Sequence, residues 1–145
     1  MQKSVSLLGI DLAKSVFWVR AEDELGREVM NRKVSRAQLF ETVIQLKPRR
    51  VVMEACGGAH SWGRKLQAQG IEVGLIAPQH VRPFRRGDKN DANDTLAICE
   101  AARRPNLKLV RVKSEQQQDW QLVVNERASL VTRRTEILNR LRSVL

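Results

Sequence analysis

This chain of 145 residues is long enough for one compact domain with a sizeable core and an appended element, but too short for two full domains. Lysine and arginine outnumber aspartate and glutamate by 26 to 16, and the formal net charge of +10 indicates a polyanionic partner, DNA or RNA, rather than a membrane surface. No apolar run approaches the roughly 18 residues that a membrane span needs, and there is no long apolar leader segment. We therefore expect a cytoplasmic protein that has no membrane partner.

The first third of the chain predicts three strands. Residues 5–10, 16–20 and 28–34 are rich in β-branched or apolar residues, and turn material separates them. Residues 22–26 contain the acidic and glycine residues of a hairpin loop. The sequence therefore indicates a meander of three strands at the start of the fold.

Helices and strands alternate after this meander. Ser35 is expected to cap a helix whose apolar residues recur at helical spacing and which stops before residues 47–48. A strand over 51–53, a short helix over 61–69 and another strand over 71–76 follow. The order β-β-β-α-β-α-β is that of the ribonuclease H-like architecture, an α/β fold in which helices flank a mixed sheet.

A basic, turn-prone stretch over residues 82–90 comes next, and we expect it to face phosphate groups, although a solvated surface loop explains the same composition. A helix over about 90–103 follows, and residues 107–112 are expected to form an edge strand. The candidate nucleic-acid-binding residues are Lys14, Arg82, Arg85, Arg86 and Lys89.

From Ser114 onward the composition becomes that of a long polar helix. Apolar residues repeat every seven positions at Val124, Val131, Leu138 and Leu145. Such a stripe favours a coiled-coil partner helix over a helix folded back on its own sheet. We therefore predict one domain over residues 1–112, the start of a helical coiled-coil linker over 113–145, and a homo-oligomer, dimer or tetramer, assembled through this helix.

Four carboxylates lie where a strand ends or a helix begins. Asp11 and Glu54 each close a short apolar run that is typical of a buried strand, while Asp91 and Asp94 fall in the first turn of the helix over 90–103. The spacing of these aspartates continues the apolar face of that helix, which aims them at the sheet. Asp88 can replace either aspartate if the helix starts sooner.

Clustered carboxylates persist when they are protonated, paired with basic groups or bound to a divalent cation. Oxygen ligands suit Mg²⁺ or Mn²⁺, and two such ions can activate the attacking oxygen and stabilise the leaving oxygen in phosphodiester chemistry. The competing explanation is that the aspartates cap a helix and complement its dipole. Cys56 and Cys99 have no zinc-ligand spacing, and we expect both to be reduced core thiols.

Three segments together resemble the DEDD-type transposases of bacterial insertion sequences, which are RNA-guided recombinases related to pilin-gene invertases. The segments are Gly9-Ile10-Asp11-Leu12-Ala13-Lys14, Met53-Glu54-Ala55-Cys56-Gly57 and Lys89-Asn90-Asp91-Ala92-Asn93-Asp94. The resemblance implies a RuvC-like domain of ribonuclease H fold in which Asp11, Glu54, Asp91 and Asp94 form the catalytic, metal-binding tetrad. Asn90, where the family often has threonine, is a small departure.

The resemblance also implies properties of the full-length protein. These are a noncoding bridge RNA that pairs with donor and target DNA, composite active sites in a homo-oligomer, and a second domain whose serine becomes linked to DNA. The sequence given ends before such a domain, so we expect this chain by itself to bind metal and nucleic acid without recombining DNA.

Three other functions fit parts of the pattern. A stand-alone RuvC-like, Mg²⁺-dependent endonuclease would use the same carboxylates to activate water. A sugar-kinase or actin-like ATPase also opens with a strand ending in Gly-x-Asp, but it needs a longer chain and leaves the positive charge unexplained. A non-enzymatic basic nucleic-acid-binding module predicts binding that does not depend on a divalent metal or on Asp11.

Overall fold

The computed structural model describes residues 4–87 and 91–145, excluding the side chain of Asp91. The chain divides into two compact units, Met1–Val112 and Lys113–Leu145. The elements in chain order are β1 (Leu7–Asp11), β2 (Val16–Glu22), β3 (Glu28–Ser35), α1 (Arg36–Leu46), β4 (Arg50–Glu54), α2 (Gly57–Gln67), β5 (Glu72–Ile76), α3 (Pro78–Val81), the 3₁₀ helix η1 (Arg82–Phe84), α4 (Asp91–Ala102) and α5 (Glu115–Val144).

The strands of the first unit form one mixed, five-stranded sheet in the order β3-β2-β1-β4-β5. β1, β2 and β3 pair antiparallel as the predicted meander, whereas β1 with β4 and β4 with β5 are parallel. Parallel neighbours run in the same direction, so the carboxyl ends of β1, β4 and β5 meet at one edge of the sheet. That edge is where the candidate site lies.

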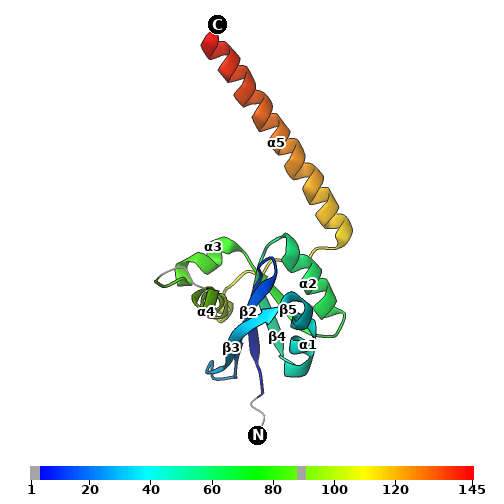
Figure 1. Ribbon diagram of the computed structural model, residues 1–145, viewed down its shortest axis with the longest axis vertical. Coiled ribbons are helices and arrows are strands. Elements are labelled where there is room, and N and C mark those ends of the chain that lie inside the picture. Colours follow the sequence, from blue (N-terminus) through cyan, green and yellow to red (C-terminus); the bar gives the residue numbers. More distant parts are fainter. Residues whose placement is uncertain (1–3, 88–90) are drawn as a thin grey trace. The chain divides into compact units, whose positions relative to one another are not determined.

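Helices cover both faces of the sheet (Figure 1). α1 and α2 pack on one face, and α4 packs on the other. Successive side chains of one strand point to opposite faces. The core under α1 and α2 therefore takes Leu8, Ile10, Val51, Met53 and Leu75, whereas the core under α4 takes Leu7, Val52 and Ile76 together with Ala97, Ile98 and Cys99.

Local signals explain where several elements begin and end. The Ser35 hydroxyl accepts a hydrogen bond from the backbone N–H of Gln38 at 3.3 Å and caps α1, as the sequence predicts. Lys47 ends α1 in the left-handed conformation, with φ of 45°. Gly26, with φ of 76°, closes the hairpin loop between β2 and β3 because glycine adopts this conformation without steric cost.

One predicted helix start and one predicted strand were wrong. The second helix begins at Gly57 rather than near residue 61. Glycine has a low helix propensity, but burial of Ala59 against the core outweighs it. Residues 107–112 form no strand; Val110 makes a single bridge to Leu75, with a backbone N···O distance of 2.8 Å.

The second unit is one 30-residue helix, α5. Its start carries a capping box, in which Ser114 and Gln117 exchange side-chain and backbone hydrogen bonds. The predicted heptad residues are exposed, and a parallel series that was not predicted runs beside them: Val123, Leu130, Ile137 and Val144. Within residues 4–87 and 91–145, no helix is long and apolar enough to cross a membrane.

Candidate metal centre and nucleic-acid interface

Asp11 and Glu54 emerge side by side from neighbouring parallel strands. Ile10 on β1 is paired with Met53 on β4, and the next residue on each strand is a predicted metal ligand. Parallel strands lie about 4.8 Å apart, so the two carboxylates leave the sheet close to each other. Because Ile10 and Met53 point into the core under α1 and α2, Asp11 and Glu54 face the α4 side.

Helix α4 runs antiparallel to β1 and brings its first turn to the same edge. Gly9 permits the close approach: a Cβ there would lie only 2.5 Å from the Cys99 sulfur and 3.3 Å from the Thr95 carbonyl oxygen. Directly after the carboxyl end of α4, Arg103 pairs with Glu22, which lies opposite Leu7 at the start of β1. The amino-terminal end of α4, with Asp94, therefore lies over the carboxyl end of β1.

Arg85 joins two of the predicted ligands. Its Nη2 lies 2.8 Å from Glu54 Oε2, and its Nε lies 3.1 Å from Asp94 Oδ1. The Asp94 side chain is 13% exposed and the Glu54 side chain is 26% exposed, whereas the Arg85 side chain is 41% exposed. One guanidinium thus pairs with two carboxylates, from β4 and α4, and compensates one of their two negative charges.

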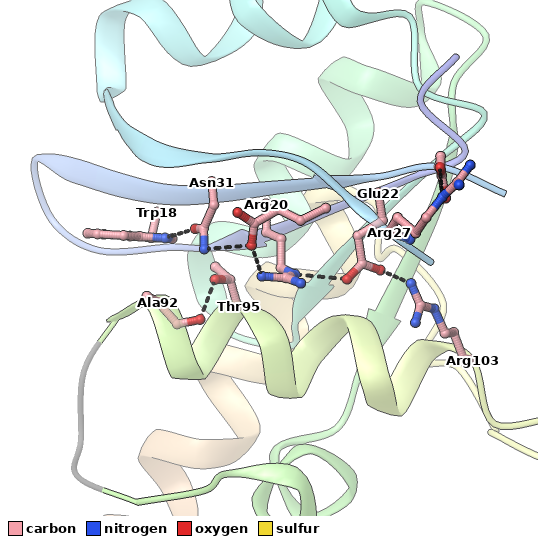
Figure 2. Close-up of polar contacts among 10 residues, drawn as sticks. Trp18, Arg20, Glu22, Arg27, Asn31, Ala92, Thr95 and Arg103 are labelled. Carbon is pink, nitrogen blue, oxygen red and sulfur yellow. Dashed lines mark hydrogen bonds and ion pairs between the residues drawn. The ribbon is translucent and has the colours of Figure 1, made fainter. Parts of the chain in front are cut away.

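A network of polar contacts connects α4 to β2 (Figure 2). Glu22 is almost fully buried and receives both Arg20, at 2.8 Å, and Arg103. Burial by itself would lower the pKa of Arg20, but the hydrogen bond and charge of Glu22 and the charge of Glu28 raise it. The buried carboxylate is therefore held between two guanidinium groups, one on the sheet and one on the residue that follows α4.

Cys99 packs as an apolar group between these layers. Burial, followed by the charge of Glu22, raises the pKa of its thiol to about 12, so the thiol is neutral at physiological pH. Cys99 is buried and free, as predicted. Cys56 is also free, but it is exposed, and the prediction of a core position for it was wrong, because it lies at the start of α2, where the chain leaves the sheet edge.

The donor set suits a hard divalent cation. Glu54 and Asp94 share one cationic group, and the half-buried Asp11 ends the neighbouring strand. Among the side chains that the structure describes, no three His, Cys, Asp or Glu residues already lie close enough to hold a metal ion. Asp91, the fourth predicted ligand, begins α4, but its side chain lies outside the described part, as does all of Asp88.

The predicted nucleic-acid-binding residues have different surroundings. Lys14 is exposed in the loop after β1, and Arg82 is exposed at the start of η1. The side chain of Arg86 is 80% exposed, with its nearest carboxylate, Glu100, at 3.9 Å. Arg85 is instead paired with the carboxylates, and Lys89 lies outside the described residues.

Sequence reasoning missed Trp18 as a neighbour of the site. Trp18 lies directly opposite Asp11 in the antiparallel pairing of β1 and β2. Its indole N–H donates to the side-chain oxygen of Asn31, and the Lys33 ammonium lies 5.3 Å from the ring centroid. The alternation of residues 16–22 was the signal that could have placed it on the α4 face together with Arg20 and Glu22.

Comparison with known proteins gives concordant results. A family model described as "Transposase", of the DEDD type named after insertion sequence IS110, matches residues 8–145. The transposase for insertion sequence element IS1111A of Coxiella burnetii is 46% identical over 143 residues, which cover 99% of this chain and 39% of that protein. A probable family 20 transposase of Pseudomonas aeruginosa is 47% identical over 142 residues, covering 98% and 42% of the two chains. The chain thus spans about two fifths of the length of these relatives.

Solved structures share the fold at low sequence identity. RuvC of Thermus thermophilus matches with a TM-score of 0.51 and 15% identity, over 72% of this chain and 99% of that one. The same protein in complex with a Holliday junction substrate matches with a TM-score of 0.53 and 16% identity, over 72% and 98%. The predicted ribonuclease H-like, RuvC-like sheet with flanking helices, followed by a long carboxyl-terminal helix, is confirmed.

Proposed function

Because this chain belongs to the DEDD transposase family of insertion sequences, we propose that it is the metal-binding and nucleic-acid-binding domain of an enzyme that cuts and exchanges DNA strands. One observation carries the proposal: Glu54 and Asp94, from different elements, converge on the Arg85 guanidinium beside the strand that ends in Asp11. A buried edge that collects carboxylates in a chain of net charge +10 is suited to position a metal ion against a phosphate.

The proposed ligands are Asp11, Glu54, Asp91 and Asp94, with Asp11 between the sites because it ends the central strand. Bound Mg²⁺ or Mn²⁺ would supply activation of the attacking oxygen and stabilisation of the leaving oxygen. The carboxylates are held on two packed layers, the sheet edge and α4, which fixes the direction from which each one approaches the proposed metal.

The same edge is proposed to bind the phosphate backbone. Lys14 is exposed in the loop that follows β1, Arg82 and Arg86 are exposed in the segment between α3 and α4, and Lys89 precedes α4 in the sequence. Lysine and arginine contacts to phosphates release counterions, which makes affinity fall steeply with salt. The RuvC structure with a Holliday junction supports branched DNA, such as exchanging donor and target strands, as the substrate class.

Three further proposals concern the full-length protein and rest on the family resemblance. They are a noncoding guide RNA that pairs with donor and target DNA, a homo-oligomer with composite sites, and a separate domain that carries a nucleophilic serine. The net charge of the chain supports an RNA partner as readily as a DNA partner. The proposed location of the protein is the cytoplasm, in association with the nucleoid.

The strongest competing function is a basic nucleic-acid-binding module without a metal. One observation favours it, since Arg85 already pairs with Glu54 and Asp94. In that case the carboxylates have only a structural role, and nucleic-acid binding does not depend on divalent ions. A stand-alone RuvC-like endonuclease would bind metal like the transposase domain, but it would cleave DNA without a second domain.

Calorimetric titration of Mn²⁺ and Mg²⁺ in the presence of a short DNA duplex tests the proposal. We expect Asp11→Asn to weaken Mn²⁺ binding at least about tenfold, roughly 1.4 kcal/mol, because it removes an anionic ligand. The matched control is Asp119→Asn, which makes the same chemical change on an exposed residue of α5 and is expected to leave binding unchanged. Circular dichroism checks that both variants fold. Equal binding by the wild type and Asp11→Asn would support the basic module instead.

A further inference from the structure

Arg85 takes the position that a metal ion needs. It follows η1, and its guanidinium contacts Glu54 at 2.8 Å and Asp94 at 3.1 Å through two different nitrogens. These are oxygens of two proposed metal ligands. A guanidinium and a divalent cation cannot occupy the same space between them, so the two cations compete.

The surroundings allow the guanidinium to leave. The Arg85 side chain is 41% exposed, whereas Asp94 is 13% exposed and lies against the sheet. Arg85 lies outside the regular secondary structure and four residues after Val81, which is buried in the core beneath α4. The carboxylates are therefore anchored while the cation that joins them can move into solvent by rotating its side chain.

We propose that Arg85 is a built-in counter-cation, which joins Glu54 to Asp94 in the metal-free protein, is displaced by the divalent ion, and then binds a backbone phosphate of the nucleic acid. The proposal rests on the metal-binding function proposed above. It makes nucleic-acid binding follow metal binding. When the divalent ion binds, it frees the positive charge of Arg85 for the nucleic acid at the edge where the metal acts. Before the metal arrives, Arg85 compensates one of the negative charges of Glu54 and Asp94; after displacement, its positive charge is available to a phosphate.

The neighbouring residue supplies a matched control. Arg86 carries the same charge one position later, but its side chain is 80% exposed and approaches Glu100 only to 3.9 Å. Arg86→Gln removes one positive charge from the same segment and leaves the ion pairs of Arg85 with Glu54 and Asp94 in place. Any effect that appears in Arg85→Gln and not in Arg86→Gln is therefore caused by loss of the two ion pairs of Arg85, and not by the change in net charge.

The first experiment measures Mn²⁺ affinity by calorimetry, without nucleic acid, in the wild type, Arg85→Gln and Arg86→Gln. We expect Arg85→Gln to bind Mn²⁺ about threefold to thirtyfold more tightly than the wild type, because the competing ion pairs are gone. Arg86→Gln is expected to match the wild type. We also expect Arg85→Gln to melt at a lower temperature in chelator, where Glu54 and Asp94 repel, and to regain the wild-type melting temperature in saturating Mn²⁺.

The second experiment measures how affinity for a short DNA duplex changes with salt, with and without Mn²⁺. The slope of log affinity against log salt reports the number of phosphates neutralised. Mn²⁺ should steepen the slope of the wild type by about one phosphate more than that of Arg85→Gln. Arg86→Gln should have a shallower slope than the wild type under both conditions and the same response to Mn²⁺.

The outcomes separate the two proposals. Absence of Mn²⁺ binding in all three proteins overturns both the metal site and the displacement of Arg85. Binding by the wild type with equal or weaker binding by Arg85→Gln leaves the metal site standing and overturns the displacement. Equal tightening in Arg86→Gln also overturns it. An identical response of the salt slopes to Mn²⁺ in the wild type and Arg85→Gln overturns the transfer to phosphate.

Discussion

At the residue scale, Gly9 sets how closely α4 can approach the sheet. A Cβ at this position would lie 2.5 Å from the Cys99 sulfur, a distance at which something must move. The same glycine opens the motif that ends in Asp11, so the spacing between the sheet and the helix that carries Asp94 depends on it. The sequence shows the glycine, but only the packing shows what it lies against.

Gly9→Ala is therefore expected to push α4 away from β1. We expect a destabilisation of about 1–3 kcal/mol, as for other overpacked cores, together with weaker Mn²⁺ binding because Asp94 moves with the helix. Chemical denaturation and calorimetry measure the two effects. The double variant Gly9→Ala/Cys99→Ala removes the sulfur and should recover part of the stability. If the single variant has wild-type stability and Mn²⁺ affinity, then α4 does not depend on this close contact.

Arg85 has partners that its neighbours in the sequence do not reveal. Its place in a basic, turn-prone segment predicted a phosphate contact, but the structure pairs it with Glu54 and Asp94. Those carboxylates lie 31 and 9 positions away in the sequence, and no local pattern connects residues at such separations. Its role toward nucleic acid stays a prediction, which the salt-slope experiment addresses.

At the scale of elements, α4 is the part of the fold that completes the candidate site. Its apolar residues pack on the sheet, and Glu22 holds its far end through Arg103 while Arg20 approaches the same carboxylate from β2 (Figure 2). The contact lies at the opposite end of the helix from Asp94. Glu22 therefore acts as a structural anchor that keeps the helix aligned on β1.

Glu22→Gln tests this anchor. The change leaves Arg20 and Arg103 without their buried carboxylate, and we expect a loss of about 2–4 kcal/mol, below the range for a fully buried pair because the Arg103 side chain is 43% exposed. Glu24→Gln makes the same change on an exposed turn residue and should cost no more than about 0.5 kcal/mol. Urea denaturation measures both. Similar stabilities for the two variants would show that the anchor contributes nothing to the fold.

Most elements were predictable from local pattern. Segments rich in β-branched or apolar residues marked the meander, and Ser35 marked the start of α1. The predictions failed where tertiary contacts outweigh local preference: α2 takes in the glycines at 57–58, and residues 107–112 follow β5 through one bridge and the Leu109 side chain instead of a full ladder.

At the scale of the whole molecule, the chain combines a sheet-based unit with a helix that has an exposed apolar stripe. Val131 is 49% exposed and Leu138 is 39% exposed, and a groove on α5 is lined by Leu122, Val123, Glu126, Arg127, Leu130, Val131 and Arg134. Apolar residues repeated every seven positions are stabilised by burial against another helix. We propose that a second copy of this chain provides that helix.

Val131→Asp/Leu138→Asp is expected to convert an associated chain into a monomer, because burying two carboxylates in the seam is unfavourable. The control is Thr132→Asp/Asn139→Asp, which adds the same charge one residue farther along, about 100° around the helix from Val131 and Leu138. Light scattering measures the mass of each protein. An unchanged mass of the first variant, or a wild-type chain that is already monomeric, would contradict association through this stripe.

The class of fold, the strand ends that carry Asp11 and Glu54, the start of the helix that carries Asp94, and the basic character of the molecule were all predictable. These features depend on local periodicity, capping and charge, which neighbouring residues encode. The folded structure was needed to show that α4 lies antiparallel on β1 at Gly9, that Glu22 anchors it, and that Arg85 joins Glu54 to Asp94. Those contacts join segments far apart in the chain, and packing selects them only when the sheet and the helix come together.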